Sequence, residues 1–297
     1  MVNSMSETTG QKHTKSLDTL VSDIYSQLEG LSNGEPLNIP EEELDRTIDG
    51  IRECILHWSQ PSERNKNFTL RMSNVGRPAR QLWFEKNSDV NNKPSPATQI
   101  KFLYGHLLEE IVLMLVRLSG HTVEAEQKEA KVQGITGHMD SVIDGEVVDI
   151  KTASKFAFKK FQNGTLAEDD GFGYLAQLAC YEASEGTSNG GFLVLNKESG
   201  ELCLFRPDDL EKPNVERTIP ELIKAVESDD MPPRCHDPIP DGKKGNMKLP
   251  KGCNWCSYKH ACYADANDGA GLRGFKYSSG VVYLTEVVSE PNVEEIL

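Results

Sequence analysis

The stretch "GHMDSVIDGEVVDIKTAS" (residues 137–154) decides the expected fold, because it has the pattern of a tight β-hairpin. Asp144 and Gly145 form a two-residue turn signal between segments in which side chains alternate in character. Such a turn fixes the register, so that Asp140 faces Asp149 across the hairpin. His138 and Lys151 then oppose each other and project from the same face as the carboxylates. The other, mostly apolar, face consists of Met139, Ser141, Ile143, Val148 and Ile150.

Two directly opposed carboxylates need an explanation, because like charges at this separation destabilise a sheet. A divalent cation would remove the repulsion. Oxygens from Asp140, Asp149 and the backbone carbonyl of Ile150 suit Mg²⁺ or Mn²⁺. Lys151 would lie beside the ion and pair with a phosphate oxygen or orient an attacking water. The alternative is an exposed hairpin that carries ordinary polar residues.

An apolar helix expected over residues 100–120 carries Glu109 among leucines, and a buried charge there needs a partner such as a metal. Glu110 is the competing candidate, and His106 is close in sequence. If both glutamates face solvent, neither is a ligand. A second expected helix, "YLAQLACYEASE" (174–185), places Gln177 and Tyr181 four residues apart on one face.

Together, "GHLLE", the hairpin stretch and "QLACY" resemble, in order and spacing, the PD-(D/E)XK nucleases of RecB type. The likeness is greatest to phage-encoded exonucleases and to CRISPR-adaptation nucleases, and it covers about residues 70–288. It is specific as a set of motifs. It implies that Glu109 is the acid of the first motif, that Asp140 is the first strand acid, and that Asp149 and Lys151 form the D-x-K pair. It also implies that Gln177 and Tyr181 match the QxxxY signature and hold the DNA strand.

The function that the resemblance implies is a Mg²⁺- or Mn²⁺-dependent deoxyribonuclease, most simply an exonuclease, acting in DNA processing, degradation or recombination. Lys151 would position the hydroxide that attacks the phosphate. No histidine is clearly placed to protonate the leaving group, except that His138 lies near the site. The alternative function is a non-catalytic DNA-binding or assembly module that keeps the fold and the cysteines. A third is a regulatory protein that binds zinc alone.

Four of the seven cysteines cluster near the C-terminus, namely Cys235, Cys253, Cys256 and Cys262. In a reducing compartment such a cluster indicates a metal site before a disulfide framework. The remaining cysteines, Cys54, Cys180 and Cys203, are expected to be buried structural thiols.

The segment "CNWCSYKHAC" (253–262) resembles the C-terminal trio of the iron–sulfur members of the family, which a distant N-terminal cysteine completes. Here the corresponding N-terminal region, "SNVGRPARQLWFE" (73–85), has no cysteine. Cys235 is the nearest replacement and Cys54 a weaker one. The likeness favours a [4Fe–4S] cluster, and Zn²⁺ is the alternative, either through four thiolates or with His260 as a ligand.

The net charge of −14 argues against bulk electrostatic attraction to nucleic acid. However, residues 151–160 hold four lysines and no acid, and residues 242–260 hold five lysines and no acid. Such runs are usually solvated faces. Because both lie beside the motifs above, they indicate a track for DNA phosphates.

The order of expected elements predicts an α/β fold, with a restriction-endonuclease-like core whose small mixed central sheet is flanked by helices. Further helices are expected at 17–31, 39–59 and 214–228, a strand within 121–133, and hairpins at 190–207 and 274–288. The N-terminal helices could dock a protein partner or cover a sheet edge.

The expected division of the chain has five parts. They are a disordered segment (1–16), a helical N-terminal element (17–97), the nuclease core (98–228), a Cys-rich metal-binding segment (229–270) and a C-terminal hairpin with an acidic tail (271–297). No apolar run is long enough to span a bilayer, and no secretion signal is visible. We therefore expect a cytoplasmic protein, located in the host cytoplasm if it is phage-encoded, with no membrane partner.

Overall fold

The computed structural model describes residues 15–60, 68–88 and 93–296. Residues 1–14 of the segment expected to be disordered lie outside these ranges. Contacts group the chain into two compact units of three segments each. The first comprises Met1–Pro61, Ser95–Asp169 and Leu178–Lys212, and the second comprises Ser62–Pro94, Asp170–Gln177 and Pro213–Leu297. This division follows contacts alone, and the functional boundaries expected from the sequence stay a prediction.

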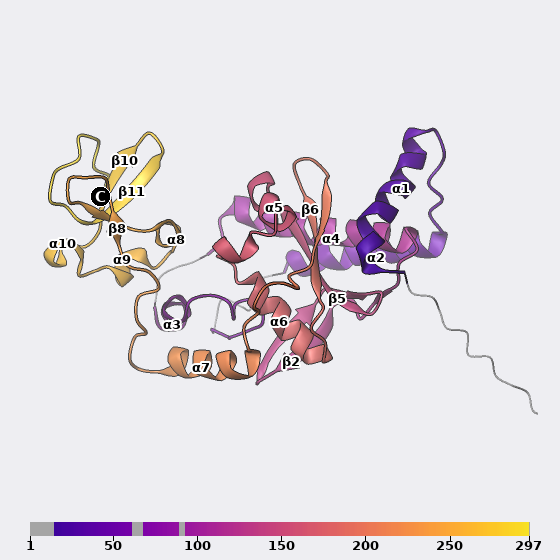
Figure 1. The fold of residues 1–297 in the computed structure, drawn as a ribbon, viewed down its shortest axis with the longest axis horizontal. Helices are drawn as coiled ribbons and strands as arrows, with labels where there is room; N and C mark the ends of the chain where they lie inside the picture. The colour runs from indigo at the N-terminus through magenta and orange to yellow at the C-terminus, as the bar shows by residue number, and fades with distance from the viewer. Residues whose placement is uncertain (1–14, 61–67, 89–92, 297) are drawn as a thin grey trace, which may run out of the picture. The chain divides into compact units, whose positions relative to one another are not determined.

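A five-stranded mixed sheet forms the centre of the first unit (Figure 1). Its strand order is β1-β4-β5-β6-β7, in which β5 and β6 are parallel and all other neighbours are antiparallel. The strands are β1 (Val123–Glu124), β4 (Ser141–Ile143), β5 (Glu146–Ala153), β6 (Gly191–Asn196) and β7 (Leu202–Phe205). With helices packed against it, this sheet confirms the predicted α/β class with a mixed central sheet.

Helices flank both faces of the sheet. They are α1 (Leu20–Ser32), α2 (Glu41–Trp58), α4 (Pro96–Leu118), α5 (Lys155–Gln162) and α6 (Tyr174–Glu185), with short 3-10 turns at Leu17–Thr19 and Leu166–Asp169. Helices α1, α4 and α5 lie against the strands of the sheet, and α2 packs on α4. Helices α1 and α4 share one apolar cluster with the strands, which contains Ile143, Val148 and Ile150 as predicted. On the opposite face, the buried ring of Phe161 in α5 lies 5.5 Å from that of Phe192 in β6.

Helix α4 begins earlier than the sequence pattern indicated. The side chain of Ser95 accepts a hydrogen bond from the amide of Thr98 at 3.2 Å, and Pro96 occupies the first turn. A serine cap followed by proline is a favourable helix start, because the proline lacks only an amide hydrogen that would be unpaired there. The helix gives way at Ser119 to Gly120, whose φ is +84°.

The two-residue turn of the central hairpin is confirmed. Asp144 and Gly145 have φ values of +51° and +86°, as a type I′ turn requires. The pairs Ser141–Val148, Val142–Val147 and Ile143–Glu146 follow from this turn and match the predicted register.

The hairpin ladder ends at Ser141, and the chain then leaves the central sheet. β3 (Ile135–Met139) pairs instead with β2 (Lys128–Val132), so that His138 lies opposite Glu129. The predicted pairing of His138 with Lys151 is therefore wrong. The expected strand within 121–133 is divided into β1 and β2, because Ala125 and Gln127 adopt left-handed backbone conformations with φ of +54° and +51°.

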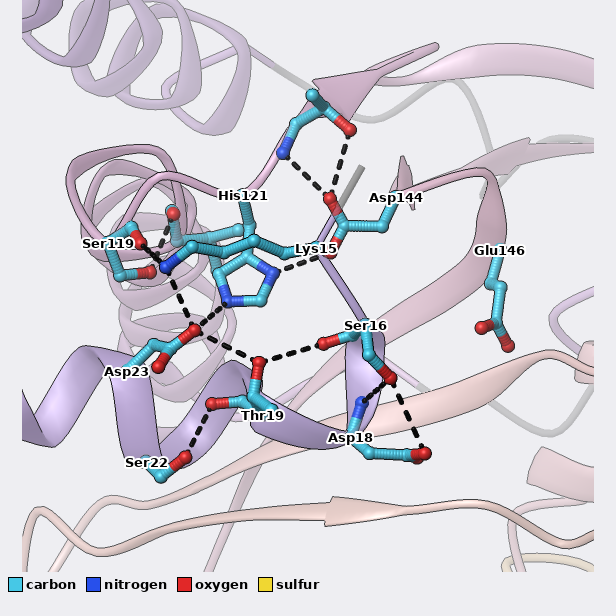
Figure 2. Close-up of polar contacts among 12 residues, drawn as sticks. Lys15, Ser16, Asp18, Thr19, Ser22, Asp23, Ser119, His121, Asp144 and Glu146 are labelled. Carbon is cyan, nitrogen blue, oxygen red and sulfur yellow. Dashed lines mark hydrogen bonds and ion pairs between the residues drawn. The ribbon is translucent and has the colours of Figure 1, made fainter. Parts of the chain in front are cut away.

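A buried polar cluster fixes the hairpin turn to the N-terminal segment (Figure 2). The carboxylate of Asp144 lies 2.5 Å from Nδ1 of His121 and accepts hydrogen bonds from the amide and the hydroxyl of Thr122. The Nε2 atom of His121 lies 3.1 Å from Asp23 of α1, whose carboxylate also accepts a hydrogen bond from Lys15. The side chains of His121 and Asp144 are 0% and 1% exposed. This cluster holds in place the turn that sets the register of β5.

The second unit is built around the C-terminal residues. It contains α3 (Ala79–Asn87), α7 (Val215–Glu227), the short helices α8 (Lys251–Asn254), α9 (Lys259–Cys262) and α10 (Ala266–Gly269), and a sheet of order β10-β11-β9-β8. Its strands are β8 (Ile239–Pro240), β9 (Met247–Lys248), β10 (Arg273–Tyr277) and β11 (Gly280–Glu286). The last two strands form the predicted C-terminal hairpin. Helix α3 packs against α7, and the ring of Phe84 stacks on that of Tyr258 at 5.7 Å.

Among the helices that the structure describes, none combines the length and the apolar character that a membrane crossing needs.

Candidate functional site

Asp149 in β5 is the most unusual carboxylate of the described chain. Its side chain is fully buried, and neither oxygen has a hydrogen-bond partner among the described residues. Its Oδ2 atom lies 2.5 Å from Nζ of Lys151, but this contact has the geometry of an ion pair only. A buried carboxylate is costly unless it is paired and hydrogen-bonded, so a further positive charge is expected at this position.

Asp140 lies immediately before β4 and faces the edge of β5 that β4 leaves open. Its Oδ2 atom accepts a hydrogen bond from the amide of Ile150 at 2.8 Å. Burial raises the pKa of Asp140 well above its usual value, and the negative charges of Asp149 and Glu109 raise it further. Lys151 and the Ile150 amide oppose this rise. Asp140 and Asp149 are therefore close enough to repel each other, as the sequence predicted.

The backbone of Ile150 is oriented as the expected metal site requires. In an extended strand, the amide and carbonyl of one residue point to the same side. Because the Ile150 amide points to Asp140, its carbonyl faces that side too. The side chain of Ile150 is buried in the apolar cluster on α4.

Glu109 in α4 contributes the third carboxylate. Its Oε1 atom accepts a hydrogen bond from Nε2 of Gln127 at 2.8 Å. Burial raises the pKa of Glu109 to about 7, with Lys151 opposing the rise and Asp149 adding to it. The carboxylate thus lies within the electrostatic field of the Asp149–Lys151 pair.

The neighbouring Glu110 points toward α2 instead. A Cβ atom added at Gly50 of α2 would collide with the Glu110 carboxylate, and Sγ of Cys54 lies 4.0 Å from its Oε1 atom. Burial raises the pKa of Glu110, and Arg117 opposes the rise. Of the two candidates, Glu109 is therefore the one that faces Lys151. His106 is exposed on the same helix.

Gln127 is a site residue that the sequence did not reveal. Its amide donates to the carbonyl of Asp140 at 3.3 Å, while its side chain donates to Glu109. It thereby connects the helical acid to the strand acid. The left-handed backbone conformation of Gln127 brings it to the site, and no residue pattern in "EAEQKEAK" predicts that conformation.

The two residues of the expected QxxxY signature belong to different units. Tyr181 is buried in the first unit, and its hydroxyl donates to the carbonyl of His138 at 2.7 Å, which ties α6 to β3. Gln177 belongs by its contacts to the second unit, so the site of the first unit is described without it. Their role in holding DNA stays a prediction.

The group of Glu109, Asp140, Asp149 and Lys151 offers carboxylate oxygens of the kind that a divalent cation prefers. Among the described residues, however, no set of three or more His, Cys, Asp or Glu side chains has the arrangement of a finished metal site. The fit therefore rests on hard oxygen donors that repel one another and on the unsatisfied oxygens of Asp149.

The four clustered cysteines lie close together within the second unit. Burial raises the pKa of Cys253 to about 11, and the nearby Cys235, Cys256 and Cys262 contribute to the rise. The pKa of Cys235 is likewise raised by burial first and then by Cys262. Cys235 is thus near the trio, as expected of a fourth ligand. Among the described residues, these thiols too are not arranged as a group of three or more ligands that could hold a metal ion.

Arg80 of α3 contacts this cluster directly. Its Nε atom donates to Sγ of Cys262 at 3.0 Å, and its NH1 atom donates to the carbonyl of Pro232 at 2.6 Å. The side chain belongs to the segment in which the resemblance places a distant cysteine. A buried guanidinium at this place would offset the negative charge of metal-bound thiolates.

The other cysteines and His260 take up separate positions. Cys54 lies in α2 of the first unit beside Glu110, whereas the trio lies in the second unit. Cys180 is buried as predicted, while Cys54 and Cys203 are half-buried. The ring of His260 packs edge-on against Tyr283, with centroids 5.6 Å apart.

Comparison with known proteins identifies no family for this chain. No protein-family model matches the sequence, and a search of curated proteins found no match. Among solved structures, the chain is similar to the crystal structure of SSO0001, with 16% identity and a TM-score of 0.35. The match covers 71% of this chain and 93% of the other.

Proposed function

We propose that this protein is a Mg²⁺- or Mn²⁺-dependent deoxyribonuclease of the PD-(D/E)XK type, acting as an exonuclease on DNA. The observation that carries the proposal is the buried Asp149 carboxylate, which has an ion pair with Lys151 but no hydrogen bond within the described chain. Asp140 and Glu109 add negative charge to the same place. A purely structural cluster would satisfy these oxygens with donors, as the Asp144 cluster does.

The residues divide the work as follows. Asp140, Asp149 and the carbonyl of Ile150 would hold the cation, and Glu109 would complete its shell or hold a second ion. When bound, the cation would supply Lewis-acid activation of a water and of the scissile phosphate. Gln127 orients the Glu109 carboxylate through its hydrogen bond.

Lys151 has the position of a group that stabilises charge. It is 18% exposed, so its ammonium is partly shielded from water while it remains reachable by a substrate. Beside Asp149 it can orient the attacking water and pair with the charge that develops on a phosphate oxygen. His138 is exposed on β3 opposite Glu129, so no step is assigned to it.

The cysteines would carry a structural metal group. We propose a [4Fe–4S] cluster held by Cys235, Cys253, Cys256 and Cys262, with Zn²⁺ as the alternative occupant. The support is the mutual proximity of the four thiols and the hydrogen bond from Arg80 to Cys262. The group would join α3 to the C-terminal segment of the same unit.

A protein partner is proposed for the N-terminal helices. Helix α2 leaves large apolar side chains exposed, among them Leu44, Ile48, Ile55 and Leu56. Exposed apolar groups that share a helix are typical of surfaces covered by another protein. We propose that the protein acts as a nuclease in the cytoplasm.

The proposal is tested by the release of nucleotides from linear DNA in the presence of Mg²⁺ or Mn²⁺. Asp149→Asn and Lys151→Met should each lower the rate at least about 100-fold, since each removes a group that acts on the reacting phosphate. Glu110→Gln is the matched control for Glu109→Gln, because only Glu109 faces Lys151.

Three outcomes decide the assignment. Activity confined to DNA with open ends supports the exonuclease mode, whereas equal activity on end-blocked DNA rejects that mode. Undiminished activity in Asp149→Asn rejects the catalytic assignment. DNA binding by the wild-type protein without hydrolysis under either metal would favour the non-catalytic binding module.

A further inference from the structure

Of the three phenylalanines of helix α5, two are buried and one is exposed. Phe158 and Phe161 are 2% and 3% exposed and anchor the helix to the central sheet, whereas Phe156 is 66% exposed. On a helix, positions 158 and 161 lie on a face nearly opposite to position 156. Packing against the sheet therefore explains the two buried rings, whereas most of the Phe156 side chain is exposed to solvent.

The surroundings of Phe156 are basic. The ammonium of Lys160 lies 5.4 Å from the centre of the Phe156 ring and is held in place by the carboxylate of Asp169 at 2.8 Å. Lys155 and Lys159 are exposed, and neither ammonium has an ion pair among the residues that the structure describes. In a chain of net charge −14, this helix thus carries an exposed aromatic ring together with two lysines, Lys155 and Lys159, that have no ion pair among the described residues.

This surface is close to the candidate active site along a continuous piece of backbone. Helix α5 follows β5 directly, and the side chain of Ser154 caps it by accepting from the amide of Ala157. Phe156 follows Lys151 by five positions, so their Cα atoms are at most about 17 Å apart. That length corresponds to about five stacked nucleotides of one DNA strand.

We propose that Phe156, with Lys155 and Lys159, binds an unpaired nucleotide of the DNA substrate within a few nucleotides of the bond that is cut. An aromatic ring offers a stacking surface to any base, and flanking ammonium groups pair with the phosphates. Bases of an intact duplex already stack on their neighbours, so the ring selects a single-stranded end. This inference rests on the proposed function and names the form of its substrate.

The test measures the affinity of the full-length protein for fluorescent oligonucleotides in the presence of Mg²⁺. All variants carry Asp149→Asn, so that the DNA is not consumed. Phe156→Ala should weaken binding to a single strand about 5- to 150-fold, the range for loss of one base–aromatic stack. Phe156→Trp should keep affinity within about threefold, because the stacking surface remains. Phe102→Ala is the matched control, since Phe102 is 50% exposed on α4.

A blunt duplex provides the second arm, and its affinity should change less than about twofold in Phe156→Ala, because no unpaired base is available. Unchanged single-strand affinity, or an equal loss for both DNA forms, would overturn the inference. Loss of self-association in Phe156→Ala without any change in DNA affinity would overturn it too, by showing a protein contact. If Phe156→Ala loses single-strand affinity while the wild-type protein hydrolyses nothing, only the nuclease proposal fails.

Discussion

Replacing Asp144 tests whether the buried cluster around His121 holds the central hairpin in register. The carboxylate of Asp144 makes three contacts, one with the ring of His121 at 2.5 Å and two with Thr122 at 3.0 and 3.1 Å. Removing one partner of a buried ionic pair costs about 3–5 kcal/mol. Asp23 remains on the other ring nitrogen, so the lower part of this range, about 3 kcal/mol, applies to the contacts of Asp144 before any backbone strain is added.

Two substitutions at Asp144 separate the contribution of its side-chain contacts from that of its left-handed backbone conformation. Asp144→Ala removes all three contacts and adds the strain of a left-handed alanine, so we expect a loss of about 3–5 kcal/mol in the free energy of unfolding. Asp144→Asn keeps an acceptor for Thr122 and tolerates the positive φ, so we expect a loss of about 1–2 kcal/mol. Asp18→Asn is the control, because Asp18 pairs with Arg206 at the surface and should cost less than about 0.5 kcal/mol.

The assay is urea unfolding of the full chain, followed by far-UV circular dichroism. A destabilised hairpin should also lose register, so the proposed nuclease activity should fall together with stability in Asp144→Ala. If Asp144→Ala and Asp18→Asn lose equal stability, the cluster does not fix the hairpin and the reasoning is refuted.

Other expected outcomes concern the titration of the site and the cysteines. Burial raises the pKa of Glu109 from 4.5 to about 7, so the folded protein favours the protonated carboxyl more than the unfolded chain does. The stability that this protonated group contributes is fully present below pH 4.5 and is lost as pH rises toward 7 and above. In EDTA at pH 8, Glu109→Gln should therefore be more stable than wild type by about 1–3 kcal/mol, with no difference at pH 4, as measured by urea unfolding. An equal gain in Glu110→Gln would contradict this reasoning. Arg80→Met should lower the metal bound per chain and hasten its loss to a chelator, because the donor to Cys262 is gone; unchanged metal content and release would remove Arg80 from the site. Adding Mn²⁺ should raise the melting temperature of wild type and leave that of Asp149→Asn unchanged, and an equal rise in both would place the ion elsewhere.

The sequence predicted the parts of the fold that local chemistry determines. The Asp144–Gly145 turn requires positive φ at both positions, so the dipeptide alone specified the register from Ile143–Glu146 to Ser141–Val148. The C-terminal hairpin turns between Tyr277 and Gly280, and the positive φ of +124° lies at Gly280. The apolar face with Val148 and Ile150 followed from strand alternation.

The sequence could not predict where local rules give way to tertiary contacts. The hairpin ladder was extended beyond Ser141, but β3 finds its partner in β2, and no local signal marks that exchange. Helix α4 was expected from residue 100, although Ser95 and Pro96 carry a start signal that the polar surroundings concealed. The sequence indicated only a run of lysines where α5 lies. Its phenylalanines can be recognised as anchors only from the packing of Phe161 against Phe192 and Phe205.

The same limit applies to the candidate site. The residue types and spacing singled out Asp140, Asp149 and Lys151 and favoured Glu109, with Glu110 as the competing candidate. The choice depends on the position of Gly50 in α2, against which the Glu110 carboxylate lies. Likewise, the contact between Arg80 and Cys262 joins residues 182 positions apart, which no spacing rule detects.

The proposed activity requires that Glu109, Asp140 and Asp149 bind a divalent cation beside Lys151. Isothermal titration of the full-length protein with Mn²⁺ at pH 7.5 measures this directly. We expect binding by wild type and Glu110→Gln, and loss of that binding in Asp140→Asn and Asp149→Asn. Equal Mn²⁺ affinity and stoichiometry in wild type and Asp149→Asn would contradict the claim.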